Sequence, residues 1–468
     1  MKIPLVLTTL SLALAVSTLP LPSLAAEIKT VHDFGAKGDG TTDDTAAIQK
    51  AVESGHGSLV FPKGIYKLTK TITINLDTTG FTSLSSDGTA RILMSGAGPA
   101  FHFIGTHEGS ADPGSFKPNV WEKQRMPIVR GVEIIGDHEK ANGIEFTGVM
   151  QLTVTETHIR NCFHAIHFTN RNRNLIVSNC HLYHNRGIGV FYDKVNIHQS
   201  NIVGCHISYN AGGGVVTRGG NVRNLHIGTC DIESNMSPDT PATANILIDC
   251  TGGSTGEVAV TGCTVQHNSK SPGSANIRVL GGGTLREKKS DATKEGHIAI
   301  TGNIFSDVMV NIHLDNARGV NITGNTFWEG FEHDLLIENS HAVVVGPNDF
   351  DRNPRYVVNG KWAKDINGLV FRNCSDCKLD GVLVSGVWNK DAAVLFENCN
   401  RCTITDCSIV DSDGIGLLMK NCTRTKVSDN VIRDDREEQK MNLSLKVEGG
   451  KDNTFDDNVL ANGSEGVK

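Results

Sequence analysis

Six ionisable residues in the middle of the chain occupy equivalent positions in a series of short apolar segments: Arg218, Asp249, Arg278, His313, Asp315 and Glu338. Neighbouring carboxyl groups raise one another's pKa, so that a pair can supply a general acid and a general base. Carboxylate pairs about 5–9.5 Å apart hydrolyse glycosidic bonds. An arginine beside a neutral histidine can instead neutralise a carboxylate and remove the adjacent proton, which is the chemistry of β-elimination.

A short repeated pattern aligns these residues. An aliphatic residue or Phe, two residues, a Cys or Asn pivot, one residue and another aliphatic or Phe recur twelve times, as in VSNCHL (177–182) and ITGNIF (300–305). Eight of the eleven steps between pivots are 20 to 28 residues long, which indicates a stacked solenoid. The pivots are Thr157, Cys180, Cys205, Cys230, Cys263, Asn303, Asn325, Asn348, Val382, Cys407, Asn430 and Asn458.

The pattern also predicts which solenoid forms. Its flanking apolar positions lie five residues apart, an odd number that cannot keep both on one side of a straight strand. In nine of the twelve copies the residue before the pivot is Gly, Asn or Asp, the types that most easily adopt a left-handed backbone. Each repeat is therefore strand, one-residue corner and strand, with an inward pivot about 4.8 Å from its equivalent in the next coil. This predicts an all-β parallel β-helix of about twelve or more coils.

A further strand in most coils carries the charged residues. It includes IHFT (166–169), VVTR (215–218), ILID (246–249), IRVL (277–280), IHLD (312–315) and LLIE (335–338). Alternation places the first and third residues inside and the second and fourth outside. The outer column of fourth residues reads Thr169, Arg218, Asp249, Leu280, Asp315, Glu338, Arg372, Glu397, Lys420 and Glu448, and a neighbouring column includes His167, Arg278 and His313. The coil at 187–192 has no firm register.

These columns give the candidate site. We expect catalytic roles for Asp249, Asp315, Glu338, His313 and Arg278, and substrate contacts from Arg218, His167, Asn245, Asn276 and Asn311. Asp315 and Glu338 lie one coil apart, and Asp249 and Asp315 lie two coils apart, or roughly 10 Å. Insertions near 236–243, 268–275, 281–296 and 351–367 are expected to wall a binding groove.

A structural interpretation competes with this one. The alternating charges from Arg372 to Glu448 are interpreted as stabilising pairs on a sheet surface. Arg218 with Asp249, and Arg278 with Asp249, would likewise be cross-strand ion pairs with no part in catalysis.

Composition and the N-terminal residues limit the partners and the cellular location that we expect. The 468 residues are 20% charged with a net charge of −7, which argues against nucleic acid as a partner. Residues 1–25 are predicted to be a signal peptide, since Lys2 precedes an apolar run that ends at Ser23-Leu24-Ala25. No later apolar run is long enough to predict a membrane span. We therefore expect a secreted or periplasmic protein.

The cysteines and histidines are interpreted as ladders. Five of the twelve cysteines are pivots, and Cys374, Cys399 and Cys422 form a second column, so stacked thiols are favoured over disulfides. The pairs Cys374/Cys377 and Cys399/Cys402 have zinc-ribbon spacing, which is the alternative. His158, His181 and His206 form an outward column that no acidic residue joins in register, and we predict no metal there.

The N-terminal segment predicts a cap. The open end of a solenoid exposes apolar core and must be covered. Thr41 to Asp44 is a possible capping box, and Ile48, Ala51 and Val52 form the apolar face of a helix near 43–53. The predicted parts are a capping segment at 26–56 and a β-helix at 57–468.

This segment also carries a family resemblance. DFGAKGDGTTDDTAAIQ (33–49), followed by LVFPKGIY (59–66), resembles the N-terminal segment of the pectate-lyase-like superfamily, including its rhamnogalacturonase and epimerase-like group. The resemblance implies a right-handed parallel β-helix and action on a polysaccharide as a lyase, hydrolase, epimerase or tailspike, and it leaves calcium open as a cofactor. The motifs of polygalacturonases and alginate epimerases are absent from their expected places, so both activities are disfavoured.

The sequence therefore predicts a secreted carbohydrate-active enzyme. It would cleave the glycosidic bonds of a polysaccharide, with uronate-containing or otherwise acidic chains favoured, by β-elimination or hydrolysis. The alternative is a non-catalytic carbohydrate-binding or cell-surface β-helix. A tailspike is disfavoured by the predicted signal peptide.

Overall fold

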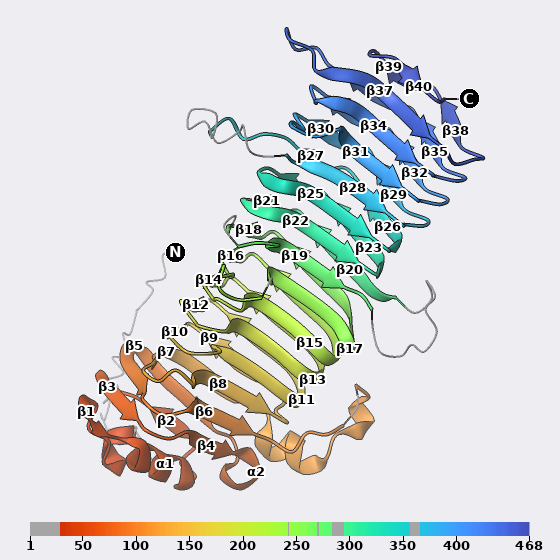
Figure 1. Ribbon diagram of the computed structural model, residues 1–468. Coiled ribbons are helices and arrows are strands. Elements are labelled where there is room, and N and C mark those ends of the chain that lie inside the picture. The colour runs from red at the N-terminus through yellow and green to blue at the C-terminus, as the bar shows by residue number, and fades with distance from the viewer. Residues whose placement is uncertain are drawn as a thin grey trace, which may run out of the picture.

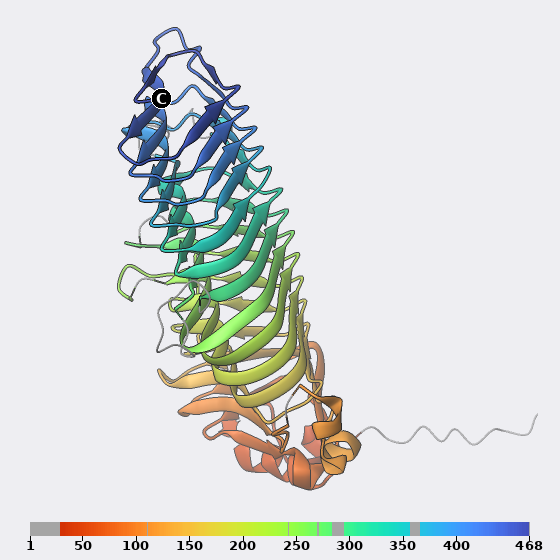
Figure 2. The same cartoon turned by 90° about the vertical axis from the view of Figure 1, so that its right-hand side faces the viewer.

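Parallel strands stack into one long β-helix (Figures 1 and 2). The structure is a computed structural model that describes residues 29–109, 111–241, 243–268, 271–282, 294–355 and 366–467. The predicted signal peptide lies outside these residues. The coils rise along one axis from the N-terminal to the C-terminal end, which confirms the predicted all-β solenoid.

Each coil contributes strands to three faces. The first face contains β4 (Ile72–Asn75), β6 (Gly98–Ile104), β8 (Ala141–Thr147), the N-terminal parts of β11 (Ile166–Ser178), β13 (Ile188–Val203), β15 (Gly213–Gly228) and β17 (Ala244–Thr261), then β19 (Ala275–Leu280), β22 (Val308–Asp315), β25 (Gly330–Glu338), β28 (Gly368–Arg372), β31 (Ala392–Glu397), β34 (Gly414–Lys420), β37 (Met441–Glu448) and β40 (Ser464–Glu465).

The second face contains the C-terminal parts of β11, β13, β15 and β17. It also includes β2 (Ser58–Val60), part of β5 (Ser83–Met94), part of β7 (Ile128–Gly136), β9 (Thr153–Thr155), β20 (Glu295–Thr301), β23 (Ala317–Thr323), β26 (His341–Val345), β29 (Lys378–Asp380), β32 (Thr403–Thr405), β35 (Lys426–Ser428) and β38 (Thr454–Asp456).

The third face begins with β1 (Asp39–Asp43) and β3 (Gly64–Leu68) and continues through the remaining parts of β5 and β7. It is then built from β10 (His158–Arg160), β12 (His181–Tyr183), β14 (His206–Ser208), β16 (Asp231–Glu233), β18 (Thr264–Gln266), β21 (Ile304–Ser306), β24 (Thr326–Phe327), β27 (Asp349–Phe350), β30 (Leu383–Ser385), β33 (Ser408–Val410), β36 (Val431–Arg433) and β39 (Val459–Leu460).

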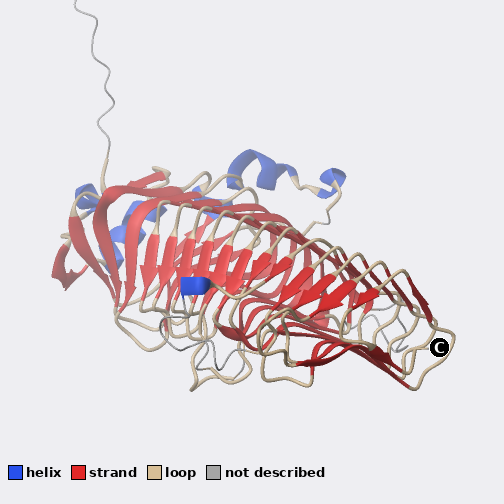
Figure 3. Cartoon of the chain, turned by 90° about the horizontal axis from the view of Figure 1, so that it is seen from above, coloured by secondary structure: helices blue, strands red, loops and turns tan. Residues whose placement is uncertain are grey.

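Helical elements gather toward the N-terminal end of the stack (Figure 3): η1 (Val31–Phe34), α1 (Thr45–Glu53), α2 (Leu76–Thr79), η2 (Pro113–Ser115) and η3 (Val120–Gln124). The predicted apolar face of α1 is confirmed, because Ile48, Ala51 and Val52 are buried in the core. No helix among the described residues combines the length and the apolar composition needed to cross a membrane.

The predicted capping box before α1 is wrong. Asp44 is the N-cap residue, but its side chain makes no capping hydrogen bond. Its carboxylate instead accepts the backbone N–H groups of Lys37 and Gly38, at 2.6 and 3.0 Å. Thr41 hydrogen-bonds to Asp39 within the preceding strand. The carboxylate of Asp44 therefore fixes the turn that leads into the first coil, and the helix depends on its packed face.

The pivots form the predicted inward ladder. The residues before them adopt left-handed backbones, with φ of 52° at Asn179 and 60° at Asp429. Asn303 Nδ2 donates to Asn325 Oδ1, and Asn325 Nδ2 donates to Asn348 Oδ1, both at 3.0 Å. Each buried amide thus satisfies the next coil's amide.

A second amide ladder lies at the corner before the first face, and it corrects one prediction. It joins Asn185, Asn210, Asn235, Asn245, Asn276 and Asn311 to Asp334. Asn245, Asn276 and Asn311 are fully buried, so they cannot contact a substrate from outside as expected. Side-chain alternation fails near the starts of these strands, where each Asn and the residue after it are both buried.

Thiols and aromatic rings complete the core columns. All twelve cysteines are free and buried, as the ladder interpretation predicts. Cys374 Sγ lies 3.3 Å from the carbonyl of Ile337, and Cys399 Sγ lies 3.5 Å from that of Phe371, each one coil earlier. The rings of Phe371 and Phe396 stack with centroids 4.3 Å apart. Identical side chains therefore fill equivalent positions in successive coils.

The amide ladder generates a stability prediction. In Asn325→Ala, the side-chain amide and the backbone N–H of Asn303 both lose Asn325 Oδ1 as their acceptor, whereas Asn348 Oδ1 keeps the backbone N–H of residue 325. Each orphaned buried group costs about 1–3 kcal/mol. We expect a lower thermal unfolding midpoint than that of Asn321→Ala, whose side chain is exposed on the preceding strand β23. Equal midpoints for the two variants would contradict the structural role of the ladder.

Candidate functional site

The first face carries the predicted outward columns in register. The strands pair Asp315 directly with Glu338, and Glu338 directly with Arg372. Asp249 lies two strands before Asp315, with Leu280 between them. The predicted alternation of inward and outward side chains is confirmed on these strands, so the face displays its charged residues to solvent.

Five residues of this face lie close together, and we call them the Asp315 cluster: Arg278, His313, Asp315, Glu338 and Arg372. Arg372 Nη1 donates to Glu338 Oε1 at 2.7 Å, and His313 Nε2 lies 3.4 Å from Glu338 Oε2. Asp315 Oδ1 accepts a hydrogen bond from the amide of Asn339 at 2.9 Å. The two carboxylates are therefore each held by a neighbouring donor, with Arg372 as an addition to the predicted set.

The histidine of the cluster is held in its neutral form. Burial lowers the pKa of His313, and the positive charge of Arg278 adds to this effect. Arg278 Nε donates to His313 Nδ1 at 3.1 Å. An accepting Nδ1 places the ring proton on Nε2, which faces Glu338. His313 Nε2 therefore faces the Glu338 carboxylate at 3.4 Å without forming a hydrogen bond to it.

Arg278 has a second set of contacts. Its guanidinium donates to the backbone carbonyl of Thr243 at 3.0 Å and to that of Gly273. These carbonyls belong to the inserted segments before β17 and β19. Arg278 thus ties the insertions to the first face and holds His313, whereas Arg372 is the cation that touches a carboxylate.

The middle of the first face is sealed. Phe191, Val216 and Leu247 occupy outward positions, yet each is buried. They belong to a small hydrophobic cluster of their own that includes Ala244 and Ala275, where the insertions rejoin the strands. The inserted segments therefore cover this part of the face, where the sequence predicted the wall of an open groove.

Of the two cross-strand ion pairs considered from the sequence, Arg218 with Asp249 and Arg278 with Asp249, the first one forms. Arg218 Nε lies 3.9 Å from Asp249 Oδ2, and the Arg218 side chain is 49% exposed. Arg278 contacts His313 instead of Asp249. The Arg218 guanidinium also lies over the ring of Phe191, 5.8 Å from its centroid. Arg218 and Asp249 thus lie beside the sealed part of the face, apart from the contacts of the Asp315 cluster.

A second cluster of polar residues lies on this face, and His167 is the one member that was predicted from the sequence. We call it the Glu145 cluster: His102, Glu145, His164, His167 and Asp193. His167 Nδ1 lies 3.4 Å from Glu145 Oε2, and His167 Nε2 lies 3.3 Å from Asp193 Oδ2. The segments IEFT (144–147) and VFYD (190–193) have the same form as IHFT, and aligning them would have identified both carboxylates.

The two carboxylates control the charge of His167. Burial opposes its protonation, but the contacts with Glu145 and Asp193 outweigh burial and raise the pKa of His167. The contact with His167 in turn lowers the pKa of Glu145. The neighbouring His164 behaves oppositely, since burial and then the charge of His167 lower its pKa to about 3. The Glu145 cluster therefore favours the protonated form of His167.

The third face carries the predicted histidine column. Ring centroids lie 4.4 Å apart for His158 and His181 and 5.0 Å apart for His181 and His206. The premise that no acidic residue joins this column is wrong: Asp231 follows His206 in register, and its Oδ2 lies 3.6 Å from His206 Nδ1. Glu133 also precedes His158 in register, so the column is a stacked ladder of rings with one carboxylate at each end.

The described residues do not offer a metal site of the kind considered for calcium or zinc. No three His, Cys, Asp or Glu side chains among them converge in a way that could hold a metal ion. The carboxylates of the Asp315 cluster point instead toward arginine, histidine and amide groups.

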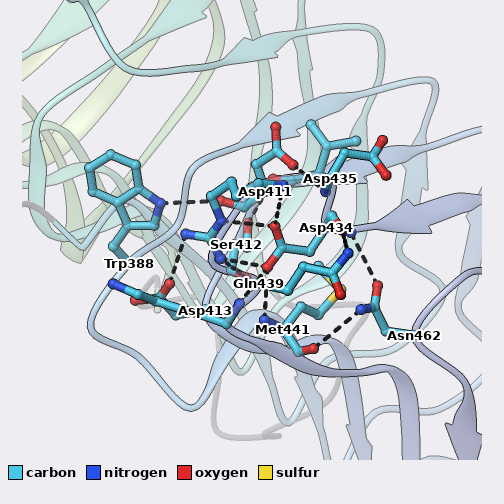
Figure 4. Close-up of polar contacts among 12 residues, drawn as sticks. Trp388, Asp411, Ser412, Asp413, Asp434, Asp435, Gln439, Met441 and Asn462 are labelled. Atoms are coloured by element: carbon cyan, nitrogen blue, oxygen red, sulfur yellow. Dashed lines mark hydrogen bonds and ion pairs between the residues drawn. The ribbon is translucent and has the colours of Figure 1, made fainter.

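An acidic group in the C-terminal coils serves structure (Figure 4). The buried carboxylate of Asp434 accepts Arg436 Nε at 2.8 Å and Nη2 at 2.7 Å, and it also accepts the backbone N–H groups of Lys440 and Met441. Arg436 Nη1 donates to Asp413 Oδ1 at 3.0 Å. These bonds hold the loop after β36 against the preceding coil.

Family comparisons agree with the fold. Residues 28–84 match the family described as rhamnogalacturonase A/epimerase, pectate lyase-like. Residues 122–269 match the right-handed beta helix region, and residues 253–468 match the periplasmic copper-binding protein (NosD) family. The resemblance to the pectate-lyase-like superfamily and the right-handed parallel β-helix are both confirmed.

Individual relatives share the fold or a short segment. Alginate lyase 7 of Azotobacter vinelandii is 52% identical over 42 residues, which are 8% of this chain and 5% of that protein. The tailspike protein of E. coli bacteriophage HK620, in complex with a pentasaccharide, superposes with a TM-score of 0.59 at 13% identity, covering 91% of this chain and 80% of the tailspike. A second structure of that tailspike with a pentasaccharide gives 0.56 at 14% identity, with the same coverage. At these identities the likeness shows the fold alone.

The Glu145 cluster generates a titration prediction. We expect the imidazole of His167 to titrate above about 6.5, the ordinary value for histidine, and that of His313 to titrate below it. Asp193→Asn removes one charge beside His167 and lowers its pKa. Histidine NMR signals followed against pH measure both values, with Asp231→Asn on the third face as the control. Titration of His167 at or below the ordinary value would contradict the assignment.

The Asp434 contacts generate a prediction about acid stability. Arg436 holds the pKa of Asp434 below its usual range, so the stabilisation is complete above the unfolded value of about 3.9 and is lost as the pH falls through the folded value. Asp434→Asn costs about 3 kcal/mol near neutral pH. Denaturant unfolding should show a smaller gap between wild type and variant at pH 3. A gap of the same size for the exposed Asp435→Asn would argue against this role.

Proposed function

We propose that this protein is an exported enzyme that hydrolyses glycosidic bonds of a polysaccharide, with Asp315 and Glu338 as its catalytic pair. The observation that carries the proposal is their direct pairing on adjacent parallel strands of the solvent-facing first face. Adjacent strands lie about 4.8 Å apart, which suits the carboxylate spacing of about 5–5.5 Å in hydrolases that retain anomeric configuration. The tailspikes that share this fold and were solved with bound oligosaccharides support a polysaccharide as partner.

The neighbouring side chains suggest a different catalytic role for each of the two carboxylates, Asp315 and Glu338. Glu338 Oε1 accepts a hydrogen bond from the guanidinium of Arg372, and Glu338 Oε2 lies 3.4 Å from His313 Nε2. A carboxylate oriented in this way suits the nucleophile that attacks the anomeric carbon. Asp315 is held by neutral amide donors and lies at the right distance to protonate the departing oxygen and then to activate water.

One observation favours a second candidate, β-elimination from a uronate. A neutral histidine beside arginine side chains is the arrangement expected for removing a proton next to a neutralised carboxylate. Two contacts weigh against β-elimination. Arg278 Nε donates a hydrogen bond to His313 Nδ1, so this nitrogen is not free to accept a proton from a substrate. The rest of the Arg278 guanidinium donates to backbone carbonyls and is not free to bind a uronate carboxylate. Hydrolysis requires no rearrangement of these groups.

Export is proposed for this protein, and copper binding is not. Export is supported by the signal-like residues 1–25 and by the periplasmic description of the NosD family matched by residues 253–468. The copper binding in that description is not proposed for this chain, since the described residues provide no set of three metal ligands.

The catalytic proposal predicts that Asp315→Asn and Glu338→Gln each lower the rate by about 10²–10⁴-fold, because each removes an acid–base group or nucleophile. Glu448→Gln, in the same outward column near the C-terminus, should keep wild-type activity. The measurement is the release of new reducing ends from a panel of acidic and neutral polysaccharides, with absorbance of unsaturated uronate recorded in parallel.

The two readouts separate the candidates. Reducing ends without ultraviolet absorbance support hydrolysis, and unsaturated product favours β-elimination. Binding with no product over a long incubation indicates the non-catalytic alternative. Full activity in both variants would remove Asp315 and Glu338 from the site.

A further inference from the structure

A separate groove runs along the second face. It encloses about 500 Å³ and is lined by residues of four successive coils: Gln151, Leu152, Thr153, Asn174, Leu175, Ile176, Gln199, Asn201, Asn224 and His226. None of them is Asp, Glu, Lys or Arg, whereas the first face is dominated by such residues. The groove therefore belongs to a different chemical environment from the Asp315 cluster.

One side of the groove is a row of amides. Gln151, Asn174, Gln199 and Asn224 lie at the corner between the first and second faces, and each has a left-handed backbone with φ between 54° and 68°. The corner recurs once per coil, so the amides follow one another about every 4.8 Å along the helix axis. They form an outward row of hydrogen-bonding groups parallel to that axis.

The other side is a row on the strands themselves. Thr153, Ile176, Asn201 and His226 pair with one another in register through β9, β11, β13 and β15. Ile176 is 42% exposed and provides an apolar surface between polar neighbours. Two parallel rows with an apolar patch suit an extended ligand that carries hydroxyl groups at its edges and C–H groups on its faces.

The hydrogen-bonding capacity of the groove is not used up within the protein. Gln151 Oε1 is buried and finds no hydrogen-bond partner among the described residues, a state that costs about 1–3 kcal/mol. Asn174 Nδ2 donates to Gln199 Oε1 in the next coil, and Asn224 donates to Glu257 at 2.7 Å. That oxygen is shielded from a ligand, but the side chains of Thr153 and Asn201 line the groove and make no hydrogen bond within the described part of the chain, so they are available to one. The linked amides beside them are held in fixed orientations.

We propose that this groove is a second carbohydrate-binding site, which holds an uncharged stretch of polysaccharide along the helix axis. The amides and Thr153 bond to sugar hydroxyls, and Ile176 contacts a C–H face of a sugar ring. A polyanion would find no lysine or arginine in the lining and would gain little there. The inference goes beyond the proposed hydrolysis and does not depend on it, because the groove and the catalytic pair lie on different faces.

The test is binding by titration calorimetry in the Glu338→Gln background, which keeps the probes intact if the proposed function is correct. The probes are neutral glucan, xylan and mannan oligosaccharides, with polygalacturonate and alginate oligosaccharides as charged counterparts. We expect a neutral probe to bind with little dependence on salt, and Gln151→Ala with Asn201→Ala to weaken it at least tenfold. The matched control is Asn321→Ala, four coils further along the row of Asn201.

The outcomes distinguish this site from the catalytic one. Binding that is lost in the groove variants and kept in the control supports the groove, whether or not Glu338→Gln abolishes hydrolysis. Binding of charged probes alone, equal affinity in all variants, or no binding by the whole panel would overturn it. Thermal unfolding of each variant shows whether a loss of binding reflects a loss of fold.

Discussion

The whole molecule depends on the in-register stacking of its coils. Most corners set a left-handed residue before an inward amide or thiol; the amides bond to their equivalents one coil away, and the thiols lie against backbone carbonyls of the preceding coil. Because the side-chain period of a strand is two, a slip by one residue would turn every inward group outward. The ladders therefore hold the register, and the register decides which residues meet on the outer faces. The adjacency of Asp315 and Glu338 is a direct product of this constraint.

In-register stacking also explains which outward residues could be predicted from the sequence and which could not. Segments such as IHLD and LLIE show clean alternation between two corners, so their outward residues could be assigned from spacing alone. The assignment failed for Asn245, Asn276 and Asn311, because near the starts of these strands consecutive residues are all buried and the simple alternation of inward and outward side chains does not hold. Asp193 was missed because Gly187 and Gly189 blur the apolar pattern of its coil. The burial of Val216 and Leu247 depends on how inserted segments fold back over the face, which no local pattern encodes.

The outer faces consequently differ in chemistry while sharing one scaffold. On the first face, charged residues of successive coils pair into the Glu145 and Asp315 clusters, separated by a sealed apolar patch. On the second face, the corresponding coils present amides and a hydroxyl without formal charge. A solenoid can host both because each residue of a coil contacts mainly its equivalents above and below. Catalysis and chain binding can then be changed independently.

The central claim is that adjacent coils place Asp315 and Glu338 at the spacing of a retaining hydrolase. The anomeric configuration of the newly released reducing end, followed by proton NMR during the first minutes of hydrolysis, tests this claim most directly. The account predicts retention, since carboxylates about 5–5.5 Å apart act through a covalent glycosyl-enzyme intermediate. Inversion would contradict it and would point to carboxylates two coils apart, such as Asp249 and Asp315.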